Sequence, residues 1–156
     1  MTKTFIEDDN KGDVAEYDEN GNLIYMRMAN GGQTWWNRNS HNKVTHYIDS
    51  DENDEVFEVW KEYNDNDIEI YYKNTNGHEY WYNDQGHVIH KKYPSGCEVW
   101  YEYDSNNKLI HKKNSKGPEF WYDSNGNKIH YKDSSGYEQW YDSNGNVIPN
   151  PNQNQS

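Results

Sequence analysis

The sequence predicts an all-β protein, an elongated antiparallel array of about seven stacked β-hairpin repeats of 19–25 residues. Three observations predict this fold class. One motif, an aromatic pair followed by a turn, recurs along the chain. The spacings between its copies differ only by even numbers. The turn signals also lie too close together for helices of ordinary length to fit between them. At 156 residues the chain has the size of one domain.

The motif is clearest at residues 81–90, 121–130 and 140–148, and a fainter copy at 17–24 has Glu16 in the place of the tryptophan. Its Asp-Ser-Asn-Gly segment suits a type I turn whose fourth residue takes a positive φ, as in a hairpin loop that ends in a glycine bulge. A second break, such as Ser135-Gly136, follows about ten residues later. Each unit is therefore expected to contain two short strands and two turns.

The spacing of the motif gives independent evidence for strands. Its anchor positions are 16, 35, 60, 81, 100, 121 and 140, so successive spacings are 19, 25, 21, 19, 21 and 19 residues. Side chains of a strand alternate between faces with period two, so an insertion of two or four residues keeps the tryptophan on its face. We therefore expect the tryptophans to share one face of the sheet.

Symmetric closure of the turn at Asp123 and Asn127 predicts a register. It predicts Trp121 opposite Ile129 and Phe120 opposite His130, which places His130 and the tryptophan on different faces. A single hairpin is marginal in water, so neighbouring hairpins are expected to bury the Trp and Ile rows between them.

The ends differ from the repeats. We expect a cap segment at 1–14, a repeat domain at 15–148 and a disordered tail at 149–156, because the tail is polar and contains proline.

Composition excludes several classes of protein. The net charge is −12 and only 31% of the residues are hydrophobic, but 7 Trp, 15 Tyr and 3 Phe can bury enough surface for a thin fold. No stretch is long and apolar enough for a membrane span or a signal peptide, so a cytoplasmic location is expected. The single cysteine, Cys97, allows no intramolecular disulfide. The negative charge disfavours direct binding of nucleic acid.

The pattern Tyr-Asp-x-Asn-Gly-Asn-x-Ile, followed by a glycine and a second aromatic-rich strand, resembles the tyrosine-aspartate (RHS) repeat of bacterial polymorphic toxins and surface proteins. The resemblance covers about 15–148 and implies a β-hairpin shell or spiral that usually serves as a scaffold. Those proteins use many more repeats to enclose a toxin. The units are also similar to choline- and glucan-binding cell-wall repeats and to MORN-like repeats of some antitoxin proteins.

The repeated polar residues favour a structural role. His90, His111 and His130 recur in register, but adjacent lysines disfavour a metal ion. A glutamate recurs two residues before the tryptophan at Glu58, Glu79, Glu98, Glu119 and Glu138. We interpret it as a cross-strand partner of Lys or Tyr, because a catalytic carboxylate would normally break the symmetry of the repeat. We expect neither a metal site nor a cofactor, and no enzymatic activity.

Charge is distributed unevenly. Residues 1–69 hold 17 acidic and 6 basic residues, whereas residues 70–156 hold 10 and 9. The densest acidic part is either a solvated insertion or a surface for a basic partner; calcium binding at Asp49–Glu55 is a third alternative. Trp35-Trp36 is the only double tryptophan, so one indole must face away from the other, and an exposed one would anchor an interface. The candidate partner-binding residues are Trp35, Trp36, Asp49, Asp51, Glu52, Asp54, Glu55, Glu58, Glu62, Asp65, Asp67 and Glu69.

These observations lead to a first hypothesis of a non-enzymatic acidic repeat protein that binds another protein. It would be an inhibitor or immunity protein, anti-CRISPR-like or antitoxin-like, that mimics nucleic acid and blocks a basic partner such as a nuclease or toxin. Two alternatives stay open: a carbohydrate- or choline-binding module of the cell-wall-repeat kind, and a structural fragment of an RHS-like array.

Overall fold

The computed structural model describes residues 5–8 and 12–151, and it is built from strands without a helix in these ranges. It divides into two compact units, an N-terminal unit (Met1–Glu79) and a C-terminal unit (Tyr80–Ser156). The strands are β1 (Phe5–Asp8), β2 (Val14–Tyr17), β3 (Leu23–Arg27), β4 (Gln33–Arg38), β5 (Val44–Ser50), β6 (Val56–Tyr63), β7 (Glu69–Asn74), β8 (Glu79–Tyr82), β9 (Val88–Lys92), β10 (Glu98–Tyr103), β11 (Leu109–Asn114), β12 (Glu119–Tyr122), β13 (Lys128–Lys132), β14 (Glu138–Tyr141) and β15 (Val147–Ile148).

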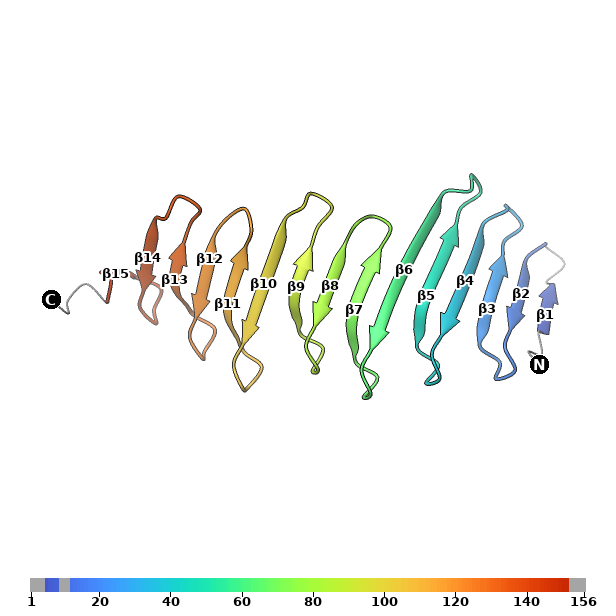
Figure 1. The fold of residues 1–156 in the computed structure, drawn as a ribbon, viewed down its shortest axis with the longest axis horizontal. Coiled ribbons are helices and arrows are strands. Elements are labelled where there is room, and N and C mark those ends of the chain that lie inside the picture. Colours follow the sequence, from blue (N-terminus) through green and yellow to red (C-terminus); the bar gives the residue numbers. More distant parts are fainter. Residues whose placement is uncertain (1–4, 9–11, 152–156) are drawn as a thin grey trace. The chain divides into compact units, whose positions relative to one another are not determined.

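Consecutive strands within each unit pair antiparallel, so the strand order follows the sequence (Figure 1). This confirms the predicted all-β hairpin array. The strand β1 already pairs with β2, so part of the segment expected to be a cap is a strand. The expected disordered tail covers residues 149–156, and the part after residue 151 lies outside the described residues.

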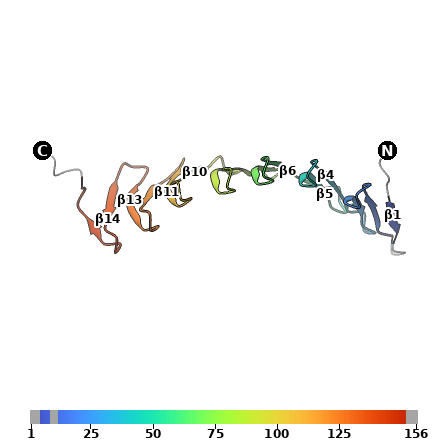
Figure 2. The same ribbon diagram turned by 90° about the horizontal axis from the view of Figure 1, so that it is seen from below.

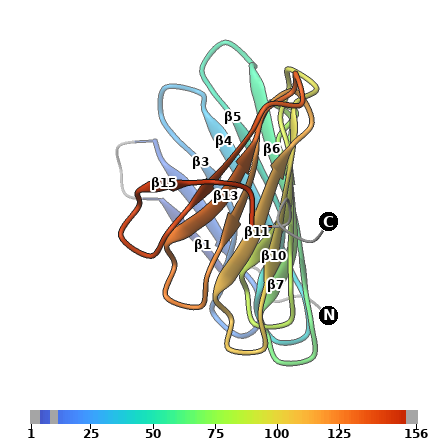
Figure 3. The same cartoon turned by 90° about the vertical axis from the view of Figure 1, so that its left-hand side faces the viewer.

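Within each unit the described strands form one layer, and no other described segment covers either face (Figure 2). They fan out by the usual twist of a sheet, as β10, β11 and β13 do in Figure 3. No described side chain is fully buried, and the buried hydrophobic residues are Val59 and Val99. The expectation that the isoleucine row is buried between hairpins is wrong, because Ile89 and Ile129 are 38% and 37% exposed. Neighbouring hairpins are joined edge to edge through their backbones, so these side chains meet no covering layer.

The turns have the predicted chemistry. The Gly126 N–H donates to the Asp123 carbonyl at 2.9 Å, and Gly126 has a φ of 86°. The Asp123 carboxylate accepts hydrogen bonds from the N–H groups of Asn125 and Asn127, each at 2.9 Å. The same arrangement recurs at the turns that begin with Asp18 and Asp142. Aspartate at the first position therefore fixes each of these three turns through its side chain.

The predicted register is wrong by one residue in the hairpin of Trp121, for which it was made. Trp121 lies opposite His130 and Phe120 lies opposite Tyr131, because the pairing shifts by one residue between Trp121 and Tyr122. Ile129 is the extra residue of a β-bulge beyond the turn, and this bulge moves His130 onto the face of the tryptophan. Equivalent shifts occur in several other hairpins, for example between Glu102 and Tyr103, whereas the last hairpin pairs Trp140 with Ile148 without one.

Within each unit, the tryptophans at the anchor positions of the motif share one face, as predicted. In the C-terminal unit, His130 lies opposite both Trp121 and Trp140. Trp100 connects to the same face through Lys113, which lies opposite both Trp100 and Glu119. The bulge does not disturb this arrangement, because Trp121 and His130 pair directly beyond it.

Candidate functional site

The face that carries the tryptophans, here called the indole face, is lined by alternating indole and imidazole rings. In the C-terminal unit, His90 stacks between Trp81 and Trp100, with ring centroids 4.5 and 5.0 Å away. His130 stacks between Trp121 and Trp140 at 4.3 and 4.6 Å. In the N-terminal unit His46 stacks on Trp60 at 5.1 Å. The histidines that recur in the sequence are therefore members of an aromatic ladder.

The recurring glutamates lie beside this ladder. His46 and His90 each place Nε2 2.8 Å from a carboxylate oxygen, of Glu58 and Glu98 respectively. Toward the end of the C-terminal unit, lysines join the histidines as partners of these carboxylates.

Lys113 Nζ lies 3.0 Å from Glu119, and its hydrogen bond is the main cause that lowers the pKa of Glu119. Lys132 Nζ lies 3.3 Å from Glu138. The predicted cross-strand pairing of the glutamates with lysine is thus confirmed, and histidine is a further partner. Among the described residues no three His, Cys, Asp or Glu side chains gather as metal ligands.

The acidic candidate residues do not form one surface. Asp51, Glu52, Asp54 and Glu55 occupy the turn between β5 and β6, whereas Asp65 and Asp67 occupy the turn between β6 and β7, at the other end of β6 (Figure 1). With eight residues, β6 separates the two turns by about 26 Å. The remaining acidic candidates lie on strands. Glu58 and Glu62 lie on the indole face with Trp60, whereas Asp49 and Glu69 point to the opposite face.

Several of these carboxylates already have partners. Thr34 donates to Asp49 at 2.8 Å, Lys61 donates to Glu69 at 2.8 Å, and His41 lies 2.9 Å from Asp67. Asp51 accepts hydrogen bonds from the N–H groups of Asn53 and Glu55, which lower its pKa. The structure thus groups Glu52, Asp54 and Glu55 as exposed carboxylates on one turn.

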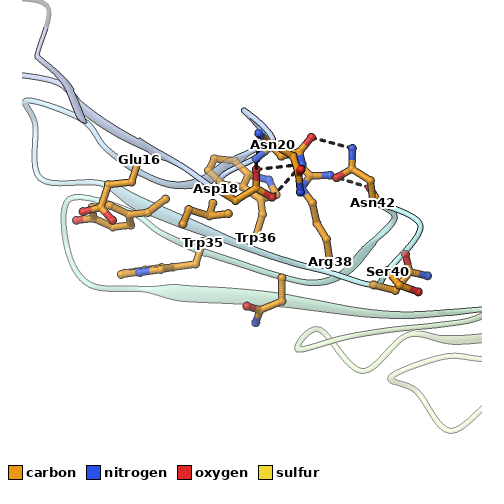
Figure 4. A pocket seen from close by; sticks show the side chains of 13 residues that line it. Glu16, Asp18, Asn20, Trp35, Trp36, Arg38, Ser40 and Asn42 are labelled. Carbon is orange, nitrogen blue, oxygen red and sulfur yellow. Dashed lines mark hydrogen bonds between the residues drawn. The ribbon is translucent and has the colours of Figure 1, made fainter. Parts of the chain in front are cut away.

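The double tryptophan lines a hollow in the N-terminal unit (Figure 4). Trp35 packs against Tyr25 with ring centroids 5.3 Å apart, and Trp36 packs against Tyr47 at 5.9 Å. Because they are adjacent in β4, the two indoles point to opposite faces, as predicted. The hollow has a volume of about 720 Å³ and is lined by Glu16, Asp18, Asn20, Asn22, Ile24, Tyr25, Trp35, Trp36, Asn37, Arg38, Asn39, Ser40 and Asn42.

The polar groups of the hollow mainly hold its own turns together. Asn42 donates to Asn22 Oδ1 at 2.8 Å, and Arg38 donates to the Asn42 carbonyl at 3.2 Å. Asp18 accepts hydrogen bonds from Asn22, and these are the main cause that lowers its pKa. No acidic residue of 49–69 lines this hollow. Sequence reasoning missed it, although the asparagines of the turns around residues 20–22 and 39–42 were a signal.

Cys97 has a structural contact, since its Sγ lies 3.3 Å from Asn114 Oδ1. The described part of the chain contains no helix that is long and apolar enough to cross a membrane.

These features define a β-hairpin repeat protein. No family model and no curated protein matches the chain. Solved structures with a similar arrangement include the Photorhabdus luminescens Tc holotoxin pore, with 11% identity, a TM-score of 0.47, and coverage of 92% of this chain and 12% of that one. A second is TcdB2-TccC3-Cdc42, with 14% identity, a TM-score of 0.39, and coverage of 87% and 7%. The chain thus spans a small part of the proteins that it matches.

Proposed function

We propose that the chain is a non-enzymatic β-hairpin repeat module of the tyrosine-aspartate type, which acts as a scaffold and presents its sheet to another protein. The observation that carries this proposal is the side-chain ladder. The same Trp, His and Glu positions are used for packing in successive hairpins, as at His90 and His130. A repeat that uses its recurring polar residues in this way leaves function to the surface that the hairpins build together.

Deletion of one repeat tests the scaffold proposal. Removing residues 121–139 takes out one 19-residue unit and joins residue 120 to Trp140, which has the position of Trp121 in the next unit. In a modular array, the shortened chain keeps its strand signal in circular dichroism, and its urea m-value falls in proportion to the surface lost, by about a tenth. Complete loss of structure would contradict modularity and indicate a fold specified as a whole.

A second candidate function is an inhibitor or immunity protein that binds a basic, nucleic-acid-handling partner through its acidic N-terminal unit. The specific observation in its favour is the exposed group Glu52, Asp54 and Glu55 on the β5–β6 turn. Exposed carboxylates at a loop tip attract a cationic cleft over a distance set by ionic strength.

The test of this candidate is affinity capture from host lysate at two salt concentrations, followed by mass spectrometry. The triple variant E52Q/D54N/E55Q removes charge and keeps Asp51, whose carboxylate holds the turn. A control variant, D84N/D104N, removes charge from turns of the C-terminal unit. A nuclease or toxin retained by the native chain and the control, but lost with the triple variant and at high salt, supports the candidate. Capture of the same partner that is unchanged by salt and by the triple variant contradicts the candidate function.

A further inference from the structure

The two faces of the C-terminal unit differ in charge. The carboxylates of its strands, on Glu98, Glu102, Glu119 and Glu138, all share the face of the tryptophans. The strand residues that point to the other face include no Asp or Glu. We call this other face the tyrosine face. Its aromatic residues are Tyr80, Tyr82, Tyr101, Tyr103, Phe120, Tyr122, Tyr131 and Tyr141.

Three lysines are the charged residues on the strands of the tyrosine face. Lys91 lies opposite Val99, Lys112 lies opposite Tyr101 and Phe120, and Lys128 lies opposite Tyr122. Within the described chain, none of the three makes an ion pair with a carboxylate. The face therefore has a local positive charge, although the whole chain has a net charge of −12.

The lysine ammonium groups lie over the rings. Lys91 Nζ is 5.3 Å from the centroid of the Tyr80 ring and 5.9 Å from that of Tyr101. Lys112 Nζ lies 5.8 Å from the Tyr101 ring, and Lys128 Nζ lies 4.1 Å from the Tyr141 ring. These cation–π contacts hold the charges among the rings and limit their freedom before a partner binds.

Among residues 80–151, no second layer covers this face (Figure 2), although a sheet usually buries an aromatic face against another element. We infer that the tyrosine face of the C-terminal unit, with Lys91, Lys112 and Lys128 among its tyrosine and phenylalanine rings, is a docking surface for an acidic, extended segment of a partner protein. Carboxylates of that segment pair with the three ammonium groups, and its apolar side chains cover the rings. This inference goes beyond the proposed function, because it assigns a positively charged binding surface to the C-terminal unit. The second candidate function uses an acidic turn of the N-terminal unit instead.

A protein segment suits this surface better than a single-stranded nucleic acid. Nucleic acid binding requires ring faces that are open to stacking bases, whereas ammonium groups already lie over Tyr80, Tyr101 and Tyr141. A polynucleotide would also bring one negative charge per nucleotide, more than the three lysines neutralise, and the excess would be repelled by the acidic residues of the chain. A peptide with a few carboxylates experiences much less of this repulsion, and three lysines are enough to neutralise it.

Fluorescence anisotropy with the full chain tests the inference. The probe, called the Glu-Leu peptide, is a labelled peptide of about 12 residues made of three copies of Glu-Gln-Leu-Gln. In an extended conformation it presents its three Glu and three Leu on one face, and it is long enough to cross the strands of one unit. A Lys-Leu peptide of the same length and an oligothymidine serve as comparison probes. The test variant is K91Q/K112Q/K128Q. The control variant K92Q/K113Q/K132Q removes three lysines from the other face of the same hairpins.

The Glu-Leu peptide is expected to bind the native chain, and the test variant should weaken binding about tenfold or more, while the control changes it by less than about threefold. Circular dichroism of both variants shows that the comparison is made between folded proteins. The inference is overturned if the peptide does not bind, if both variants weaken binding equally, or if the oligothymidine binds more tightly than the peptide.

Discussion

At the scale of single residues, the turns depend on backbone conformations that only certain residues adopt easily. Gly126 has a φ of 86° and no atom within 4 Å of the place where a Cβ would lie. G126A is therefore expected to cost about 1–2 kcal/mol of unfolding free energy through backbone strain alone. Urea denaturation measures the change. The control is G117A, because Gly117 lacks a positive φ and its nearest neighbour would be 3.8 Å away; an equal loss in both variants would contradict this explanation.

The turn aspartates make the stability of the fold depend on pH. Hydrogen bonds from Asn127 and Asn146 lower the pKa of Asp123 and Asp142 below the ordinary value of 3.8. A group whose pKa is lower in the folded state stabilises the fold above its unfolded pKa, and this contribution is lost as the pH falls through the folded pKa. Urea midpoints should therefore fall below about pH 4. In the variant D123N/D142N, the urea midpoint should fall by a smaller amount at low pH. An unchanged dependence of the midpoint on pH would contradict a role for these carboxylates.

At the scale of the secondary-structure elements, strands are joined by stacked rings as well as by backbone hydrogen bonds. His130 contacts Trp121 and Trp140 on the two neighbouring strands, with ring centroids 4.3 and 4.6 Å away. H130A removes both contacts and is expected to cost about 1–3 kcal/mol, the value of two aromatic pairs.

The variant H130F keeps a ring in the stack and should recover most of this loss in urea denaturation. I129A is the neighbouring control, since Ile129 is 37% exposed at the bulge and should cost less than about 1 kcal/mol. A large loss of stability in H130F would mean that His130 stabilises the fold mainly through its contact with the Glu138 carboxylate, which lies 3.5 Å from Nε2.

These elements also explain how far the sequence predicts the structure. The even spacings predicted strands and a shared face for the tryptophans, because alternation along a strand depends on chain geometry alone. The register was wrong because Ile129 forms a bulge, and nothing in its residue type distinguishes it from a paired isoleucine. The stacking of His130 followed from that bulge and could not be predicted without it.

The candidate site was predicted in part. Trp35 and Trp36 point to opposite faces as the alternation of a strand requires, and both line the hollow. The acidic residues looked contiguous in sequence, but β6 places its two flanking turns about 26 Å apart. Some of these acidic residues are also bound by residues on neighbouring strands. Thr34 pairs with Asp49 and Lys61 pairs with Glu69, and these contacts could not be predicted without the strand register.

At the scale of the whole molecule, the two units should respond differently to salt. The N-terminal unit holds 18 acidic and 7 basic residues, a net charge of −11, whereas the C-terminal unit holds 9 and 8. Like charges on one unit destabilise its compact state, and this repulsion is screened as the Debye length falls from about 30 Å at 0.01 M salt to about 10 Å at 0.1 M.

Hydrogen exchange followed by mass spectrometry can measure this response separately for peptides from 12–79 and from 80–151. Raising the salt concentration should increase the opening free energy of the N-terminal unit by roughly 1 kcal/mol, because each screened pair at the turns contributes a fraction of that value. The C-terminal unit should gain less, since salt also weakens attractive pairs such as Lys113–Glu119. The variant E52Q/D54N/E55Q should show a smaller response in the N-terminal unit. Equal responses of the two units would mean that their local ion pairs, and not the uneven distribution of net charge, determine how this protein responds to salt.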